Sequence, residues 1–301
     1  MPQKRPALLF PALGLNILIA SGTFLVAKAA VREFPPLTLA LLRFLLASAA
    51  LWPLTRWLRP GVRIAAEDRG RVWLLGLLAV PLNQGLFLIG MVWASASHAS
   101  LLYALTPAFV VLAGALRARR TPSAGAIAGI ALAFLGVLTL MLQRGLHFDR
   151  HSVKGDAIIL TAVVAWALYL VAGRRLIRKY GPLVVTAEAL GAGTLMYLPI
   201  GLVAARHFDP GTITPGGWMG LLYLAWLTSA VNYVIWYWGL EHIRPHSIAL
   251  LTNLQPLVTA AMAWALLHEA LPAGFALATA LVLGGVWLAQ ATDRPVPSRS
   301  E

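Results

Sequence analysis

The chain has 301 residues, of which 59% are hydrophobic and only 12% are charged. An average soluble domain carries roughly 25% charged residues, so most of this protein's surface is expected to face lipid. The chain contains no cysteine, which excludes disulfides and thiolate metal sites. A formal net charge of +13 would suit a nucleic-acid binder, but its meaning depends on where the basic residues lie.

Apolar segments of about 20 residues follow one another along the chain, the length that a helix needs to cross a hydrocarbon core roughly 30 Å thick. The first segment is too long for a signal peptide, so we expect a membrane helix there as well. The prediction is an all-α integral membrane protein with ten transmembrane helices. Their expected spans are residues 8–31, 37–57, 72–92, 97–117, 122–142, 155–176, 183–205, 216–240, 245–267 and 272–291.

The second half of the sequence repeats the first at an offset of 149 positions, the separation of Asn83 from Asn232 and of Pro107 from Pro256. Five helices per half is an odd number, so the second half must enter the membrane upside down. Such inverted repeats place a binding site near the midplane and alternate its access between the two sides. The expected division is a first repeat at 1–142, an outer linker at 143–154, a second repeat at 155–292 and a cytoplasmic tail at 293–301.

Basic residues are distributed unevenly between the two sides of the predicted bundle. Of the 24 Lys and Arg residues, 17 fall on the side of the N-terminus, 5 on the other, and Lys28 and Arg43 inside spans. Positive loops stay inside, so both termini are expected to be cytoplasmic in a cell inner membrane. Topology and lipid headgroups then explain the charge, and no nucleic-acid partner is predicted.

Three stretches read LALLRFLLA at 39–47, ASHASLLYALTPAFVVLAG at 96–114 and SIALLTNLQPLVTAAMAWALLHE at 247–269. They resemble the ten-helix, EamA-type members of the drug/metabolite transporter superfamily, and the resemblance covers essentially the whole chain. It implies a secondary transporter, commonly an exporter, with a cavity lined by the first, third, fourth, sixth, eighth and ninth helices. The acidic residue that the family often places after each fourth helix stands only in the second half, as Glu269, so no symmetric role is predicted for it.

Two prolines and several polar or aromatic residues are candidates for the cavity. A mid-helix proline releases the carbonyl four residues earlier, which in a membrane needs another partner. Pro107 and Pro256 are therefore either structural kinks or hinges, and their symmetry favours hinges. The amides and aromatic rings either pack between helices or orient a substrate. The candidate substrate-binding residues are Asn83, Tyr103, Trp166, Tyr169, Asn232, Trp236, Thr252 and Asn253.

Charged residues inside spans are functional candidates by default. Lys28 either has a role in the membrane or extends to the interface. Arg43 is either functional or a structural arginine that binds helix-end carbonyls. Glu188 is either a carrier of a coupling proton or an interface residue.

The sequence lacks the P-loop, HExxH and GxSxG motifs, so neither ATP use, an enzyme, a cofactor nor a metal is predicted. The expected first and sixth helices contain no carboxylate, which disfavours a dedicated cation exporter. We therefore predict alternating-access export of amino acids or similar small metabolites, by a monomer or homodimer in a lipid bilayer. The alternatives are export of hydrophobic cationic drugs, a membrane transferase that uses His98, His246 or His268, and a sensing or structural membrane protein.

Overall fold

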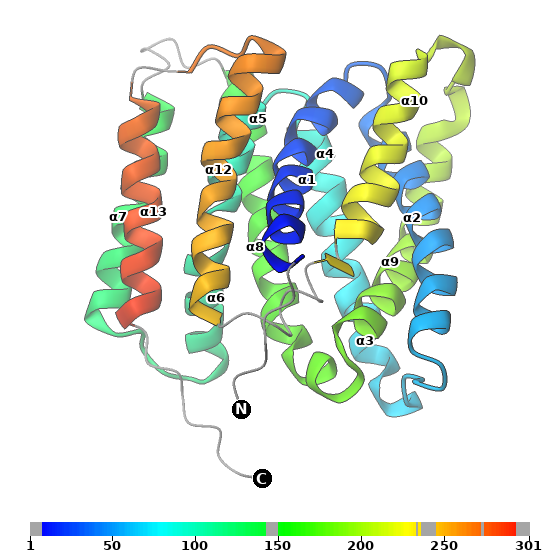
Figure 1. The fold of residues 1–301 in the computed structure, drawn as a ribbon, viewed down its shortest axis with the longest axis horizontal. Helices are drawn as coiled ribbons and strands as arrows, with labels where there is room; N and C mark the ends of the chain where they lie inside the picture. Colours follow the sequence, from blue (N-terminus) through cyan, green and yellow to red (C-terminus); the bar gives the residue numbers. More distant parts are fainter. Residues whose placement is uncertain (1–7, 143–149, 233, 236–244, 272–273, 293–301) are drawn as a thin grey trace.

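The computed structural model describes residues 8–142, 150–232, 234–235, 245–271 and 274–292. Within these ranges the chain is a bundle of helices without a strand (Figure 1). Seven helical stretches among the described residues are long and apolar enough to cross a membrane. They are Leu9–Ala30, Pro36–Leu58, Ala66–Gly90, Ala96–Arg117, Val153–Tyr180, Pro182–His207 and Phe275–Thr292.

Most of the α-helices fall within the expected apolar segments. In chain order they are α1 (Leu9–Ala30), α2 (Pro36–Leu58), α3 (Arg69–Leu77), α4 (Leu86–Gly90), α5 (Ala96–Tyr103), α6 (Thr106–Arg117), α7 (Ala124–Leu142), α8 (Arg150–Tyr180), α9 (Pro182–Ala204), α10 (Pro215–Leu222), α12 (Pro245–Leu267) and α13 (Phe275–Thr292). Short 3-10 turns are η1 (Ala66–Asp68), η3 (Ala205–His207) and η4 (Pro210–Thr212). The helix α8 begins at Arg150, earlier than expected and inside the stretch 143–154 that was predicted to be a linker.

The expected span 97–117 is divided at its proline. Helix α5 ends at Tyr103 and α6 begins at Thr106, because Pro107 has no amide proton to donate back along the helix. The Tyr103 carbonyl instead accepts a hydrogen bond from the Thr106 hydroxyl at 2.7 Å. Pro256, by contrast, lies inside the continuous helix α12. The two prolines that the repeat aligns therefore have different local structures.

Two π-helical stretches interrupt the expected third and eighth spans. They are η2 (Leu78–Gly85), which contains Pro81, and η5 (Tyr223–Val231). In η5 the Ser229 hydroxyl donates to the Leu224 carbonyl five residues earlier, at 3.0 Å. Wide turns of this kind are frequent at functional sites because they leave backbone carbonyls available to other donors.

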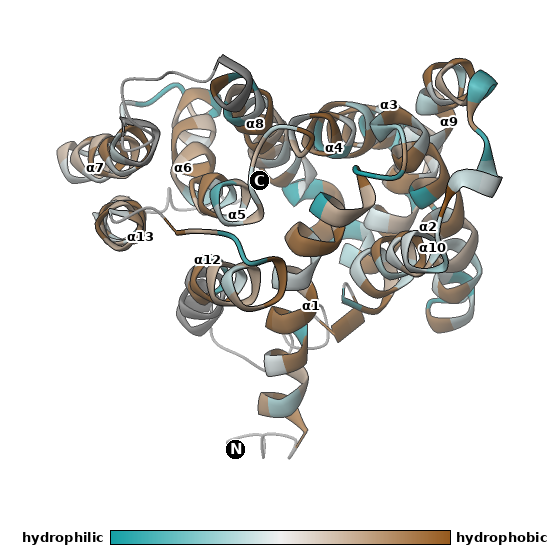
Figure 2. Cartoon of the chain, turned by 90° about the horizontal axis from the view of Figure 1, so that it is seen from above, coloured by the Kyte–Doolittle hydropathy of each residue, from teal (hydrophilic) through white to brown (hydrophobic). Residues whose placement is uncertain are grey.

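The helices α7 and α13 lie side by side at one edge of the bundle (Figure 2). Small residues form the contact between them. A Cβ atom on Gly129 would collide with the backbone of Ala289 and Gly285, and one on Gly136 would lie 2.7 Å from the Ala278 carbonyl oxygen. Small side chains let membrane helices approach this closely. The glycines therefore serve packing within the chain.

Replacing Gly129 by alanine is expected to lower the thermal stability of the detergent-solubilised protein. The added methyl group would overlap the backbone of α13, and overpacking of this kind costs about 1–3 kcal/mol. The matched control is Gly284→Ala on α13, because a Cβ atom there would meet nothing within 4 Å. Thermal unfolding of both variants tests the prediction, and equal midpoints would contradict the close packing of α7 on α13.

Candidate functional site

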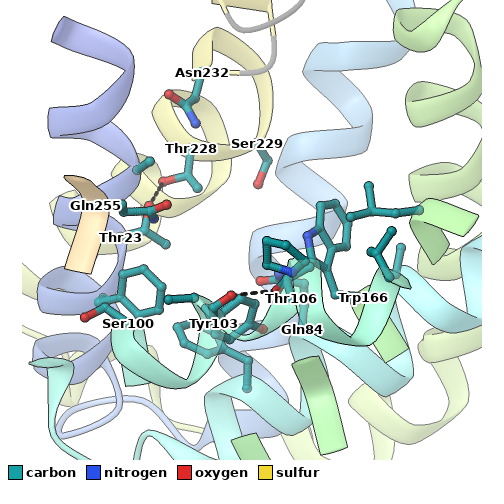
Figure 3. Close-up of a pocket in the computed structure, with 18 of the residues that line it drawn as sticks. Thr23, Gln84, Ser100, Tyr103, Thr106, Trp166, Thr228, Ser229, Asn232 and Gln255 are labelled. Carbon is teal, nitrogen blue, oxygen red and sulfur yellow. Dashed lines mark hydrogen bonds between the residues drawn. The ribbon is translucent and has the colours of Figure 1, made fainter. Parts of the chain in front are cut away.

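A central cavity of about 620 Å³ lies among most of the helices of the bundle. Figure 3 shows Tyr103 and Trp166 on one side of it and Thr228, Ser229 and Asn232 on the other. The polar and aromatic residues that line it are Asn16, Thr23, Phe24, Arg43, Phe44, Gln84, Phe87, Ser100, Tyr103, Thr106, Trp166, Arg174, Thr228, Ser229, Asn232, Gln255 and Gln290. The cavity thus combines rings, amides and hydroxyls in one space.

The cavity extends towards the end of the bundle where α1 begins and α8 ends. Arg174 lines it two turns beyond Trp166 on α8, and Gln290 lines it near the end of α13. At the opposite end of the bundle, contacts between distant segments join the helices. The Lys28 ammonium donates to the carbonyls of Met91 and Val92 at 3.0 and 3.1 Å.

The Glu269 carboxylate makes a second contact at that opposite end. It accepts hydrogen bonds from the backbone amides of Ala96 and Ser97, at 3.2 and 3.3 Å. These amides belong to the first turn of α5, where helical N–H groups lack partners and a negative charge is favourable. Glu269 therefore ties the loop after α12 to the start of α5.

Aromatic rings form one wall of the cavity. The Trp166 ring lines the cavity and stacks on Tyr169, with centroids 4.9 Å apart and planes 7° apart. Tyr169 itself is buried behind Trp166 and is not among the lining residues. The rings of Phe24, Phe87 and Tyr103 meet edge to face, with centroids 5.6 to 5.7 Å apart. These contacts hold the rings in a fixed orientation towards the cavity.

Arg43 is 2% exposed and lines the cavity from α2. Its guanidinium donates to the Gln84 side-chain oxygen at 2.8 Å, to the Leu224 carbonyl at 3.1 Å and to the Ser229 hydroxyl at 3.4 Å. The Leu224 carbonyl is available because the helix is π-helical there. Arg43 therefore binds a carbonyl inside η5, whereas the structural interpretation named helix-end carbonyls, and it also faces the cavity.

The hydrogen bonds continue from Gln84 to Asn83. The Gln84 amide donates to the Asn83 side-chain oxygen at 2.6 Å. The Asn83 amide donates to the Tyr103 hydroxyl and to the Ala162 carbonyl, both at 2.8 Å. Asn83 is fully buried and does not line the cavity, so it positions Gln84 and Tyr103, which do.

Asn232, which the repeat aligns with Asn83, does line the cavity. The Asn16 amide donates to the Asn232 side-chain oxygen at 2.7 Å and to its carbonyl at 3.0 Å. On the same side of the cavity the hydroxyls of Thr23 and Thr228 are hydrogen-bonded at 3.0 Å. The two aligned asparagines thus occupy different positions relative to the cavity.

The remaining predicted residues fall into three groups. Pro107 and Pro256 line the cavity. Glu188 lies outside it and pairs with Arg56 at 3.4 Å. The prediction for Trp236 lies outside the described residues, as do the side chains of two residues of α12, Thr252 and Asn253.

Sequence reasoning missed several lining residues, above all Arg174. It was counted among the loop arginines, although Trp166, Leu170 and Arg174 follow one another every four residues and therefore share one face of α8. The sequence also offered no reason to select Asn16, Gln84 and Gln255. Whether such an amide side chain faces the cavity depends on how its helix is rotated about its own axis.

A bundle of membrane-length helices around a central polar cavity is the architecture of a multi-pass membrane transporter. The EamA-like transporter family matches residues 12–142 and again residues 153–290. The chain therefore belongs to this family. The names of this family and of the relatives below describe transporters and not enzymes.

Three relatives align with nearly the whole chain. An uncharacterized transporter of Archaeoglobus fulgidus is 32% identical over 93% of this chain and 96% of its own. A "probable terminal-alkyne amino-acid exporter" of Streptantibioticus cattleyicolor is 29% identical, with 92% of this chain and 91% of its own covered. A "probable amino-acid metabolite efflux pump" of Salmonella typhimurium is also 29% identical, with 92% and 93% covered.

A solved crystal structure resembles this fold with a TM-score of 0.64, at 21% sequence identity, and covers 95% of this chain and 97% of its own. At that identity the likeness shows the shared fold alone.

Replacing Asn83 by leucine is expected to destabilise the protein by about 1–3 kcal/mol, because the half-buried Gln84 amide would lose its acceptor and the buried Ala162 carbonyl would lose a donor. The measurement is thermal unfolding in detergent. The control is Thr161→Val, because the exposed Thr161 hydroxyl binds only the Ala157 carbonyl of its own helix. A midpoint for Asn83→Leu as high as that of the control would contradict the positioning role of Asn83.

Proposed function

We propose that this chain is a secondary transporter that exports amino acids or similar small metabolites by alternating access. The observation that supports this proposal most is the charge of the central cavity. Arg43 and Arg174 line it, and no aspartate or glutamate is found among its described lining residues. Such a site favours a ligand that carries a carboxylate.

The face of α8 that lines the cavity offers one residue for the carboxylate of an amino acid and another for its side chain. The Arg174 guanidinium makes no hydrogen bond or ion pair with any described residue, and a guanidinium binds a carboxylate through two parallel hydrogen bonds. Trp166, two turns away, offers an aromatic surface to an apolar side chain. The amide oxygens of Gln84 and Gln255 are neutral acceptors for an ammonium group.

Export of hydrophobic cationic drugs is the less favoured alternative. A lipophilic cation would enter a cavity with two guanidinium groups and no described carboxylate to offset them. Like charges repel, and the repulsion is strongest near Arg43, which is buried. The names of the Streptantibioticus and Salmonella relatives, an amino-acid exporter and an amino-acid metabolite efflux pump, also support the amino-acid proposal.

We further propose ten membrane spans arranged as two inverted repeats, at 1–142 and 155–292. A linker at 143–154 joins the repeats, and a cytoplasmic tail at 293–301 follows the second. Two observations support this. The family matches the chain twice in succession. Arg119 and His268, which stand 149 positions apart, are the described non-glycine residues with positive φ, at 50° and 51°. A duplicated fold would retain the same unusual backbone conformation at aligned positions of its two halves.

In this proposal both termini lie in the cytoplasm, and the protein belongs to the cell inner membrane. The cavity would then open to the cytoplasm, because it extends towards the end where α1 begins and α8 ends. The contacts of Lys28 and Glu269 would close the outer end. Their release, with bending at Pro107 and Pro256, would give the substrate its exit.

The transport proposal is tested with labelled amino acids and one lipophilic cation in proteoliposomes that contain the purified protein. Arg174→Gln is expected to raise the KM for the transported amino acid about ten- to a hundredfold, since a hydrogen bond to a charged group contributes about 1.5–3 kcal/mol. The matched control is Arg175→Gln, which removes the same charge from a neighbouring residue outside the cavity. Transport of the cation alone, unaffected by Arg174→Gln, would contradict the proposal.

The topology is tested by single cysteines, since the chain has none of its own. Arg178→Cys, at the end of α8, is expected to react with a membrane-impermeant maleimide only from the cytoplasmic side. His207→Cys, at the end of η3, is expected to react only from the outer side. Both residues are exposed. Labelling of both cysteines from one side would rule out the proposed orientation.

A further inference from the structure

A second cavity, of about 780 Å³, lies on the flank of the bundle between α2, the start of α3 and α9. It shares no lining residue with the central cavity. Figure 1 shows α2 and α9 together at the edge of the bundle opposite α7 and α13. We call this cavity the flank groove. Its position at the periphery means that it faces the bilayer and not the substrate path.

The flank groove is apolar at one end and basic at the other. Leu45 of α2 and Leu195 and Leu198 of α9 line the apolar end. Glu188, where α9 pairs with Arg56, lies at the basic end. From Glu188 to Leu198 the helix rises about 15 Å, which is half of a hydrocarbon core roughly 30 Å thick. The groove therefore has the depth of one leaflet.

Two tryptophans mark the level of the basic end. Trp52 and Trp73 line the groove and are 51% and 44% exposed. Large, exposed indole rings concentrate at the boundary between hydrocarbon and headgroups. The basic end is thus at headgroup level, and the apolar end lies among acyl chains.

The arginines of the groove exceed its carboxylates. Arg56, Arg63 and Arg69 line it together with one acidic residue, Glu188. The Arg56 guanidinium is held by Glu188 at 3.4 Å and lies 4.9 Å from the centre of the Trp52 ring. Arg63 and Arg69 make no hydrogen bond or ion pair with any described residue. Two guanidinium groups are therefore available to a ligand.

From this arrangement we infer that the flank groove binds an anionic glycerophospholipid of the leaflet next to the end of α2. The guanidinium groups of Arg63 and Arg69 bind the phosphate, since their planar donors match its oxygens. An acyl chain lies along Leu45, Ala49, Leu195 and Leu198. A zwitterionic lipid binds more weakly, because its own ammonium group already offsets the phosphate charge. This site is independent of the proposed substrate.

The test uses the delipidated, full-length protein in detergent, with lipid binding measured by native mass spectrometry. Wild-type protein is expected to retain phosphatidylglycerol in preference to phosphatidylcholine of the same chains. The double variant Arg63→Gln/Arg69→Gln is expected to bind phosphatidylglycerol about 30-fold more weakly, because each arginine near a headgroup contributes about fivefold. The control Arg175→Gln/Arg178→Gln removes two exposed arginines outside the groove and is expected to bind like the wild type.

A second variant tests the apolar end without changing any charge. Ala49→Trp fills the acyl part of the groove and is expected to weaken phosphatidylglycerol binding while all arginines remain. Inorganic phosphate serves as the probe for a bare anion site, and it is expected not to displace the lipid at millimolar concentration. Circular dichroism and size-exclusion chromatography establish that each variant is folded.

Three outcomes would overturn the inference. The first is equal binding of phosphatidylglycerol by the Arg63→Gln/Arg69→Gln variant and its control. The second is that the wild-type protein retains phosphatidylcholine as well as it retains phosphatidylglycerol. The third is a sign that the groove holds an anion and not a lipid. Either of two results would be such a sign: Ala49→Trp binds phosphatidylglycerol as tightly as the wild type does, or inorganic phosphate fully displaces the lipid.

Discussion

Inside a bilayer every backbone N–H and C=O group needs a partner within the protein, and this constraint decides where the chain can depart from a regular helix. The departures gather around the central cavity. At the break between α5 and α6, Thr106 satisfies the Tyr103 carbonyl. In η5, Arg43 and Ser229 satisfy the Leu224 carbonyl. Irregular backbone therefore persists where polar side chains replace the missing helical donors, and those side chains also give the cavity its chemistry.

The same constraint explains why the polar network is shared among many helices. Arg43 reaches η2 and η5, while Asn83 reaches α5 and α8. Each bond both satisfies a buried group and fixes a lining residue in one orientation. A buried network in which each polar group has a hydrogen-bond partner is rigid, because breaking a bond leaves a polar atom with no partner and no water to replace it. The contacts of Lys28 and Glu269 add to this network at one end of the bundle, where they join segments that are distant in the sequence.

Charge is divided between two environments with different consequences. Arg43 and Arg174 line the central cavity, where a carboxylate-bearing solute would meet them. The flank groove is lined by Arg56, Arg63 and Arg69, to which the proposed lipid would present its phosphate. The net charge of +13 does not tell which arginines line the central cavity and which line the flank groove. Nor does it separate these two groups from the exposed arginines at the end of α8.

The sequence by itself determined the features that depend on composition and period: an all-helical membrane protein, its long apolar segments, the family, and the departure from a regular helix at Pro107. It also indicated Tyr103, Trp166 and Asn232, since polar and aromatic residues in apolar spans are uncommon. Only the tertiary structure decided which side chains face the cavity. Asn83 is buried behind it and Arg174 faces it, because the direction of a side chain depends on the rotation of its helix against neighbours distant in sequence, which no local pattern encodes.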